Sequence, residues 1–488
     1  MLKHIDKQQS RDYKSALKSK KEKKYEESIE FYTKILARDP HNIVYLEELS
    51  YLYLEKDMLE KAHDCLNKIR MIQPNNGVNL NNIGICLYKM GNYESAIDAF
   101  KQILRIKNDI PDVYNNISNC YVGLKRYGLA ESVLKISLRL RDDADIHFRL
   151  GNIYFYMKRY EESIEHYKKT PPTHDNLYNI SFPYLATYNF KLGFELYENR
   201  LFNNRIHPQT GEIQRVEIPQ LRDWNGKDPC QNLLIIYEQG IGDNIQYYRF
   251  IIELSVRNPQ IKITYFCKKL VSHILSSFPN IRVETSSIDV AKYDYKMFIM
   301  SLPHFLQLDT ITPNKINYII QNYEKINFWK NKLSETDKKY RVGFVHNGLL
   351  SSFIEKNIPI KEFEKLTELG LDMELICICK PHEIKEEDKS KLKNVKLFDI
   401  DKDAPFQDTA AILQNIDLLI TIDTAIVHLA GIMGVKTWLL LGYGSDWRWS
   451  TKKDTFWYTS VELVRMTENV ELTYIMKTVQ DKLIDMCK

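Results

Sequence analysis

The 34-residue period in the first third of the chain constrains the fold more than any other feature. Aromatic or apolar anchors recur at intervals of 34, 34, 34 and 33 residues, with a small residue three positions after each. A second series of small residues keeps the same intervals. The anchors are Tyr25, Leu59, Tyr93, Tyr127 and Tyr160; the two small series are Ser28, Ala62, Ala96, Ala130, Ser163 and Ala16, Ser50, Gly84, Ser118, Gly151. Helix pairs that pack closely at small side chains have this period, so we predict an α-solenoid.

These units resemble tetratricopeptide repeats, whose stacked helix pairs form a superhelix with a concave groove. A degenerate sixth unit is expected over roughly 174–202, with Phe190–Arg200 as its second helix. Pro171-Pro172 breaks the chain just before it. We therefore predict a repeat array over 1–202, with about five repeats and the degenerate sixth, followed by a linker over 203–229.

The composition is that of a soluble globular chain with room for two or three domains. Of the 488 residues, 44% are hydrophobic and 27% charged, and the net charge is +4. A net charge of +4 over this length gives no indication of nucleic-acid binding. No membrane span is indicated, because no run of about 18 apolar residues is present. The eight cysteines are scattered, and Cys377 and Cys379 alternate with isoleucines in what we interpret as a buried strand, not a metal site. A reduced, cytoplasmic protein fits this usage best.

From about residue 230, short apolar runs alternate with helical stretches. The first run begins at Leu233 and ends in a glycine turn before a helix; further strand-like runs occur at 261–266, 295–300, 341–346, 373–379 and 418–422. An alternating β/α pattern of this kind predicts parallel sheets. We expect two Rossmann-like lobes, over 230–335 and 336–488.

The clearest candidate for ligand binding is the turn that follows the run at 418–422. Asp423, Thr424 and Ala425 lead without a gap into an apolar-periodic helix, and a second apolar run follows Gly434. Free N–H groups and the helix dipole at such a helix start both favour an anion such as phosphate. The alternative is that Thr424 serves only as the N-cap.

This segment resembles the C-terminal signature of the heptosyltransferase-like glycosyltransferases. The resemblance lies in Asp408–Leu413, Asp417 and Asp423–Gly431, while Gly442–Trp449 resembles the branch of that family with tetratricopeptide repeats. It implies a GT-B arrangement, with the acceptor on the side of the first lobe and the nucleotide sugar on the side of the second. O-linked N-acetylglucosamine transferase is similar in this general plan of helical repeats followed by a GT-B unit.

The resemblance implies that Asp243 is the catalytic base. Heptosyltransferases carry an aspartate in this turn between the first strand and its helix. An inverting transfer needs a base to take the proton of the acceptor hydroxyl on the face opposite the leaving group. From position alone, Asp243 could instead only cap the helix. Glu238, Gln239 and Gly242, in the same turn, are candidate contacts to acceptor or phosphate.

The donor site is expected in the second lobe. Lys356 falls where related enzymes place a basic residue on the donor's diphosphate, and positive charge there stabilises the leaving group. Asn347 and Gly348 follow His346 where the tetratricopeptide branch has Trp-Ser-Gly, and that branch has arginine in place of Lys356. The alternative for Lys356 is a solvated loop lysine.

Three further side chains, those of His428, Asp446 and Arg448, complete the candidate site. Asp423, Thr424 and Ala425 would hold the diphosphate, and His428 lies one helical turn beyond Thr424 on the same face. Core packing is the alternative for His428. Asp446 and Arg448 follow a strand end at the predicted cleft, where Arg448 could contact phosphate or acceptor.

No metal or cofactor is expected besides the nucleotide sugar itself. The run Asp399–Asp403 has the Asp-x-Asp spacing of metal-dependent sugar transferases. It is predicted to lie in a surface loop, where Lys402 offsets its charge, so we do not assign a metal to it.

Three functions remain open at this point. The first is an inverting, metal-independent glycosyltransferase that uses a nucleotide-diphosphate sugar and a protein or peptide acceptor held in the repeat groove. The second has a glycan or lipopolysaccharide acceptor. The third is a repeat scaffold for protein–protein interaction with an inactive transferase module, because His346 and Lys356 depart from the family pattern.

If Lys356 contacts the diphosphate, Lys356→Ala should weaken nucleotide-sugar binding by about 1.5–3 kcal/mol, the worth of a hydrogen bond to a charged group. Isothermal titration calorimetry measures the change. Unchanged affinity would refute this placement of the lysine.

Overall fold

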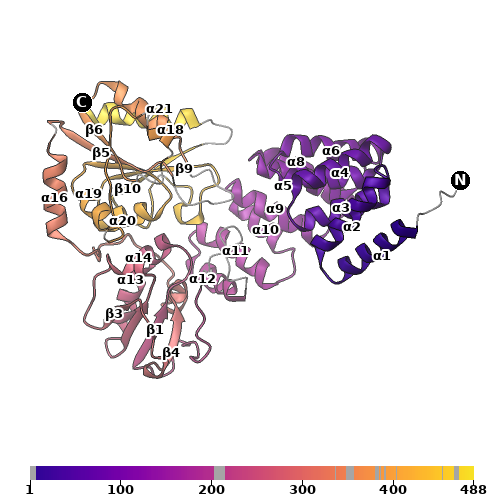
Figure 1. The fold of residues 1–488 in the computed structure, drawn as a ribbon. Helices are drawn as coiled ribbons and strands as arrows, with labels where there is room; N and C mark the ends of the chain where they lie inside the picture. The colour runs from indigo at the N-terminus through magenta and orange to yellow at the C-terminus, as the bar shows by residue number, and fades with distance from the viewer. Residues whose placement is uncertain are drawn as a thin grey trace. The chain divides into compact units, whose positions relative to one another are not determined.

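The computed structural model describes residues 7–202, 215–335, 337–347, 357–379, 384, 386–389, 392–402, 404–452, 454–466 and 472–488. The chain divides into two compact units, Met1–Ile153 and Tyr154–Lys488. The described residues of the first unit form helices, and the second unit holds further helices and two parallel sheets (Figure 1). Within these ranges, no helix is long and apolar enough to cross a membrane.

Each predicted repeat anchor is the first residue of a helix, which confirms the interpretation of the 34-residue period as helix pairs. The ten helices of the five pairs are α1 (Lys7–Lys21), α2 (Tyr25–Arg38), α3 (Ile43–Glu55), α4 (Leu59–Ile72), α5 (Gly77–Lys89), α6 (Tyr93–Ile106), α7 (Pro111–Gly123), α8 (Tyr127–Leu140), α9 (Ala144–Tyr156) and α10 (Tyr160–Tyr167). Pro111 begins α7, where its missing N–H costs nothing.

The small residues of the repeats lie where the two helices of a pair meet. Ser28 and Ala62 are fully buried, and the Ser28 hydroxyl donates to the carbonyl of Ala16, 2.8 Å away on the partner helix. A Cβ atom on Gly84 would lie 2.5 Å from the ring of Phe100. Larger side chains at these positions would therefore separate the helices, which explains why small residues recur there.

A sixth helix pair precedes the first sheet. It consists of α11 (His174–Ala186) and α12 (Phe190–Tyr197), and a 3-10 turn, η1 (Glu198–Phe202), continues α12. A Cβ atom on Gly193 would lie 2.7 Å from Leu185, so this pair has the same close contact as the others. The compact-unit boundary after Ile153 places this pair with the two sheets.

The first sheet has four parallel strands in the order β3-β2-β1-β4. They are β1 (Asn232–Ile236), β2 (Lys262–Phe266), β3 (Ile281–Glu284) and β4 (Tyr295–Phe298). Residues 215–229, part of the predicted linker, lie against this sheet. Trp224 is 5% exposed, and its backbone N–H donates to the carbonyl of Lys296 on β4 at 2.8 Å.

The second sheet has six parallel strands in the order β10-β9-β8-β5-β6-β7. They are β5 (Tyr340–Phe344), β6 (Met373–Cys377), β7 (Val395–Leu397), β8 (Leu418–Ile422), β9 (Thr437–Leu441) and β10 (Val461–Arg465). Counted from β5, this is the doubly wound Rossmann order, and ligands of such sheets bind at the carboxyl ends of the strands where the order reverses. The two Rossmann-like lobes predicted from the sequence are therefore present.

The helices of the two lobes are α13 (Ile241–Arg257), α14 (Lys269–Ser272), α15 (Leu302–Phe305), α16 (Tyr323–Leu333), α17 (Ile360–Glu364), α18 (Glu386–Lys389), α19 (Gln407–Leu413), α20 (Ala425–Met433) and α21 (Leu472–Cys487). The predicted lobe boundary at 335 would place α16 in the first lobe, but α16 packs beside α19 of the second lobe (Figure 1). Asp408 of α19 accepts from Trp329 Nε1 at 2.9 Å and from Lys325 Nζ at 2.7 Å.

Candidate functional site

The candidate site forms where the N-terminus of α13 in the first lobe meets the N-terminus of α20 in the second. Each helix follows a strand next to the point where its sheet reverses order, β1 and β8 respectively. Gly242 makes the close approach: a Cβ atom there would lie 2.9 Å from His428 and 3.3 Å from the backbone of Ala425. The turn with Asp243 and the turn with Thr424, distant in sequence, thus lie side by side.

Asp243 has two partners in this contact. One carboxylate oxygen accepts from the backbone N–H of Gly240 at 3.0 Å, which caps α13, and the other accepts from Arg448 Nη2 at 2.6 Å. Burial raises the pKa of Asp243 above its ordinary value of 3.8, Asp446 and Asp423 act in the same direction, and Arg448 offsets part of the effect. A carboxylate with a raised pKa is a stronger base.

Arg448 is the central cation of the site. It sits in the 3-10 turn η6 (Trp447–Trp449), and its guanidinium also donates to Asp446 at 3.0 Å and to Gln246 at 3.2 Å. The carboxylates of Asp446 and Asp243 hold its pKa well above the ordinary value, against the effect of burial. The predicted Asp446 and Arg448 are therefore brought to Asp243, whereas Gln246 was not among the predicted residues.

Thr424 is the N-cap of α20, as the simpler alternative predicted, with its hydroxyl accepting from the N–H of Ile426 at 3.3 Å. Such a cap leaves other N–H groups of the first turn available to an anion. His428 is 5% exposed, stacks on Trp449 and pairs through Nδ1 with the hydroxyl of Tyr458 at 2.9 Å. Its contacts match those of a core histidine.

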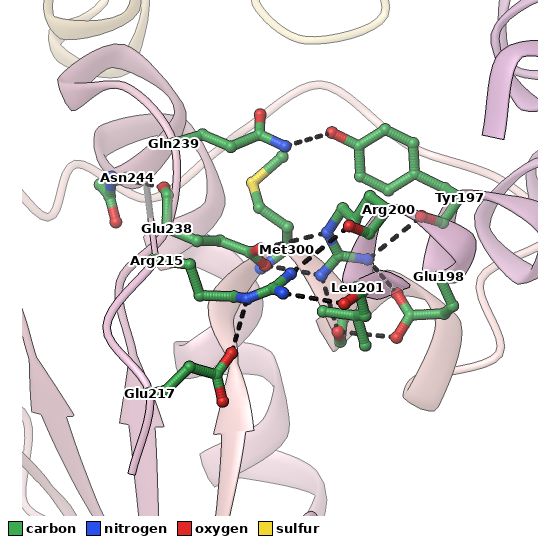
Figure 2. Close-up of polar contacts among 11 residues, drawn as sticks. Tyr197, Glu198, Arg200, Leu201, Arg215, Glu217, Glu238, Gln239, Asn244 and Met300 are labelled. Atoms are coloured by element: carbon green, nitrogen blue, oxygen red, sulfur yellow. Dashed lines mark hydrogen bonds and ion pairs between the residues drawn. The ribbon is translucent and has the colours of Figure 1, made fainter. Parts of the chain in front are cut away.

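Glu238 and Gln239 connect the first lobe to the sixth helix pair (Figure 2). Glu238 is 2% exposed and accepts from Arg200 Nη2 at 2.6 Å and from the N–H of Met300 at 3.1 Å. Gln239 donates to the hydroxyl of Tyr197 at 2.7 Å. Arg215 donates to the carbonyl of Leu201 at 2.8 Å. The side chains of Glu238 and Gln239, both predicted contacts to acceptor or phosphate, are therefore hydrogen-bonded to other residues of the protein.

Two residues of the site have left-handed backbone conformations that ordinary side chains rarely adopt. Gln239 has φ 61°, directly before the Gly240–Asp243 turn, and Ser450 has φ 49°, directly after η6. Such conformations cost about 1–3 kcal/mol and persist where the surroundings impose them, often at ligand sites. Here the Ser450 hydroxyl accepts from Tyr188 at 2.9 Å, a contact to the helical segment before the sheets.

The remaining predicted donor residues are placed only in part. Asn347 follows β5, and Gly348 and Lys356 lie outside the described residues. His346 is 9% exposed and its Nδ1 lies 3.3 Å from the carbonyl of Ile358. The contact of this segment with a nucleotide stays a prediction.

In the run Asp399–Asp403, the buried Asp401 caps a helix. Its carboxylate accepts from the N–H groups of Asp408 and Thr409 at 2.8 and 3.2 Å and from the Thr409 hydroxyl at 2.6 Å. Asp399 pairs with Lys402. Both carboxylates are thus engaged with residues of the protein itself, and Asp403 lies outside the described residues.

Comparison with known proteins supports the repeat assignment. A family model described as tetratricopeptide repeat matches residues 80–109 and 144–170. The chain therefore contains tetratricopeptide repeats. A curated relative of this repeat protein, Protein FlbA of Caulobacter vibrioides, is 23% identical over 295 residues, which are 55% of this chain and 48% of FlbA. The chain thus spans about half the length of that relative.

Two solved structures show a weaker likeness. A tetratricopeptide repeat protein from Parabacteroides merdae is 17% identical, with 41% of this chain and 80% of the other covered and a TM-score of 0.35. PilW, a type IV pilus biogenesis factor, is 17% identical, with 41% of this chain and 94% of the other covered and a TM-score of 0.36. Neither TM-score is high enough to define the fold, which is given by the helices and sheets described above.

Gly242→Ala tests the contact between the two helix starts. The added Cβ atom meets backbone as well as a side chain, so we expect a loss of about 1–3 kcal/mol in the free energy of unfolding. Urea denaturation measures it, with Val256→Ala, 76% exposed on the same helix, as the control. Equal stability of the two variants would contradict the close approach.

Proposed function

We propose that the second unit is an inverting glycosyltransferase that moves a sugar from a nucleotide-diphosphate donor to an acceptor. The observation that carries the proposal is the meeting of Asp243 with the start of α20. A half-buried carboxylate with a raised pKa then lies beside a helix N-terminus suited to an anion, at the carboxyl ends of two Rossmann sheets. A base for the acceptor and a seat for the leaving diphosphate are the two functions that this transfer needs.

In the proposed reaction, Asp243 takes the proton of the acceptor hydroxyl as its oxygen attacks the anomeric carbon of the sugar. The bond from that carbon to the diphosphate breaks, and the nucleoside diphosphate leaves with the electron pair. The N–H groups at the start of α20, together with Lys356, offset the charge on the leaving group, so the proposal places no Mg²⁺ or Mn²⁺ at the diphosphate.

The acceptor is proposed to be a protein or peptide. Stacked helix pairs form concave surfaces that suit extended chains, and the first unit is built of such pairs. A glycan or lipopolysaccharide acceptor would need no such surface.

The scaffold alternative also has an observation in its favour. Asp243 caps α13 and pairs with Arg448, so its contacts have a full structural explanation without catalysis. Donor hydrolysis or transfer by the purified chain separates the two functions, because an inactive module that still binds nucleotide would give neither.

Asp243→Asn tests the base. The side-chain oxygen of asparagine can still accept from the Gly240 N–H at the start of α13, and Arg448 keeps Asp446 as a partner, so donor affinity and melting temperature should stay close to the wild type. Turnover should drop by about 10²–10⁴, the usual contribution of general base catalysis. Transfer is followed with a radiolabelled donor sugar, and Glu253→Gln, a partly exposed carboxylate on the same helix, is the matched control.

An early-melting Asp243→Asn variant would show that the residue holds the turn together. A stable variant with wild-type turnover would move the base elsewhere. Glu238 is then a poor substitute, since its carboxylate is held by Arg200.

The pH profile provides an independent test. A base acts in its deprotonated form, so activity is present above the pKa of Asp243 and is lost as the pH falls through it. Because burial raises this pKa, the acid limb of kcat/KM should lie above pH 3.8. The residual activity of Asp243→Asn should lack this limb, and a limb that persists in the variant would belong to another group.

A further inference from the structure

Three side chains that bind soft metals meet at the carboxyl ends of β5 and β6, beside the predicted donor residue Asn347. Two of them are the cysteines that the sequence alone led us to interpret as part of a buried strand and not as a metal site. The strands are parallel neighbours, with Phe344 paired to Cys377. His346 lies two residues beyond the end of β5, Cys377 is the last residue of β6, and Cys379 lies two residues further on. They are 9%, 1% and 4% exposed, and neither cysteine is in a disulfide.

The ligand atoms are close enough to share one ion. One ligand atom from each of the three lies within 4.8 Å of the other two. A tetrahedral zinc ion, with bonds of about 2.3 Å to sulfur and about 2.0 Å to nitrogen, holds its ligand atoms about 3.5–3.8 Å apart. Small side-chain rotations are therefore enough to close the cluster around an ion. The i, i+2 spacing places both thiols on the same face of the β6 extension.

The hydrogen bonding of His346 prepares one ring nitrogen for a metal. Nδ1 lies 3.3 Å from the carbonyl of Ile358, and a carbonyl only accepts, so Nδ1 carries the hydrogen. In the neutral ring the lone pair is then on Nε2, which is buried and has no hydrogen-bond partner among the residues that the structure describes. A carbonyl that accepts from one nitrogen while the other faces a metal is the usual support of a metal-binding histidine.

We propose that His346, Cys377 and Cys379 bind one Zn²⁺ ion. Binding releases the two thiol protons, and two thiolates with one neutral imidazole balance the 2+ charge, so the buried complex is neutral. Two sulfurs and one imidazole suit zinc rather than Mg²⁺ or Ca²⁺, which require oxygen. The amide oxygen of Asn347 lies 3.5 Å from Cys379 Sγ and borders the cluster, where it or a water completes the fourth position.

The ion would link the chain segments that follow β5 and β6, beyond the last backbone hydrogen bond between the two strands. Beyond Cys377, the Ile378 N–H still donates to the carbonyl of Phe344 at 2.8 Å, but the ladder between the two strands ends there. Zinc bridges the chain at His346 to the chain at Cys377 and Cys379. The transfer proposed above uses none of these residues, so the two proposals stand or fall separately.

The test uses the full purified chain, reduced, stripped of metal with a chelator and titrated with Co²⁺ and then Zn²⁺. Cobalt in a site with two thiolates gives thiolate-to-metal charge-transfer absorption, which should saturate at one ion per chain and vanish as Zn²⁺ replaces Co²⁺. Cys377→Ser and His346→Asn should weaken Zn²⁺ binding by about 100-fold or more, beyond the 10–100-fold effect of a group outside the ligands. Cys267→Ser, a cysteine 2% exposed next to the first sheet, is the matched control and should bind as the wild type does.

Three results would overturn the proposal. The first is a folded wild-type chain without the cobalt charge-transfer band. The second is equal Zn²⁺ affinity in wild type and in both ligand variants. The third is a thiol count showing that Cys377 and Cys379 form a disulfide when reductant is removed and that reduction restores no metal binding. If the variants fail to fold, the stoichiometry and band intensity of the wild type decide alone.

Discussion

The arrangement of the second unit depends on one close contact, the approach of α13 to α20 at Gly242. A side chain at this position would meet both the imidazole of His428 and the backbone of Ala425, so the two helix starts are close only because the residue is glycine. Arg448 adds a second link, because it reaches from the second lobe to Asp243 and Gln246 in the first. Every chemical role considered for the site requires these two helix starts to face one another.

A buried ionic cluster fixes the end of the helical segment to the same lobe. Arg200 is 6% exposed and pairs with Glu238, which directly precedes the strained Gln239 and the Asp243 turn. Buried ion pairs contribute little net stability, but removal of one partner leaves an uncompensated charge and is strongly destabilising. The cluster therefore acts more as a constraint on geometry than as a source of stability. It ties the position of the Asp243 turn to that of the sixth helix pair.

The sequence predicts the parts of this molecule that are periodic or strongly apolar. The 34-residue period located the helix starts, and β6, β8 and β9, in which every residue is buried, give the clearest strand signals. Strands β3 and β7 are short and partly exposed, so they carry no such signal. The sequence of α16 does not show on which lobe the helix packs, because its partner Asp408 is distant in sequence. The same distance hides Gln246, Arg200 and Tyr197 from sequence reasoning, as it hides the link between His346 and the two cysteines.

The charges at the site decide what a donor would require. Among the described residues, the carboxylates of Asp243 and Asp446 share one guanidinium, that of Arg448, and Asp423 acts with Asp446 to raise the pKa of Asp243. A diphosphate would enter a region where two carboxylates share one guanidinium, while a helix N-terminus supplies only about half a positive charge. The α20 dipole alone therefore cannot hold a nucleotide diphosphate against these carboxylates. Either a further cation joins it, as the position of Lys356 in the sequence suggests, or Asp243 takes up a proton, which its raised pKa favours but which would remove the base. Donor binding and base catalysis are compatible only in the first case, so the proposed charge at Lys356 separates a transferase from a module that binds the donor without transferring its sugar.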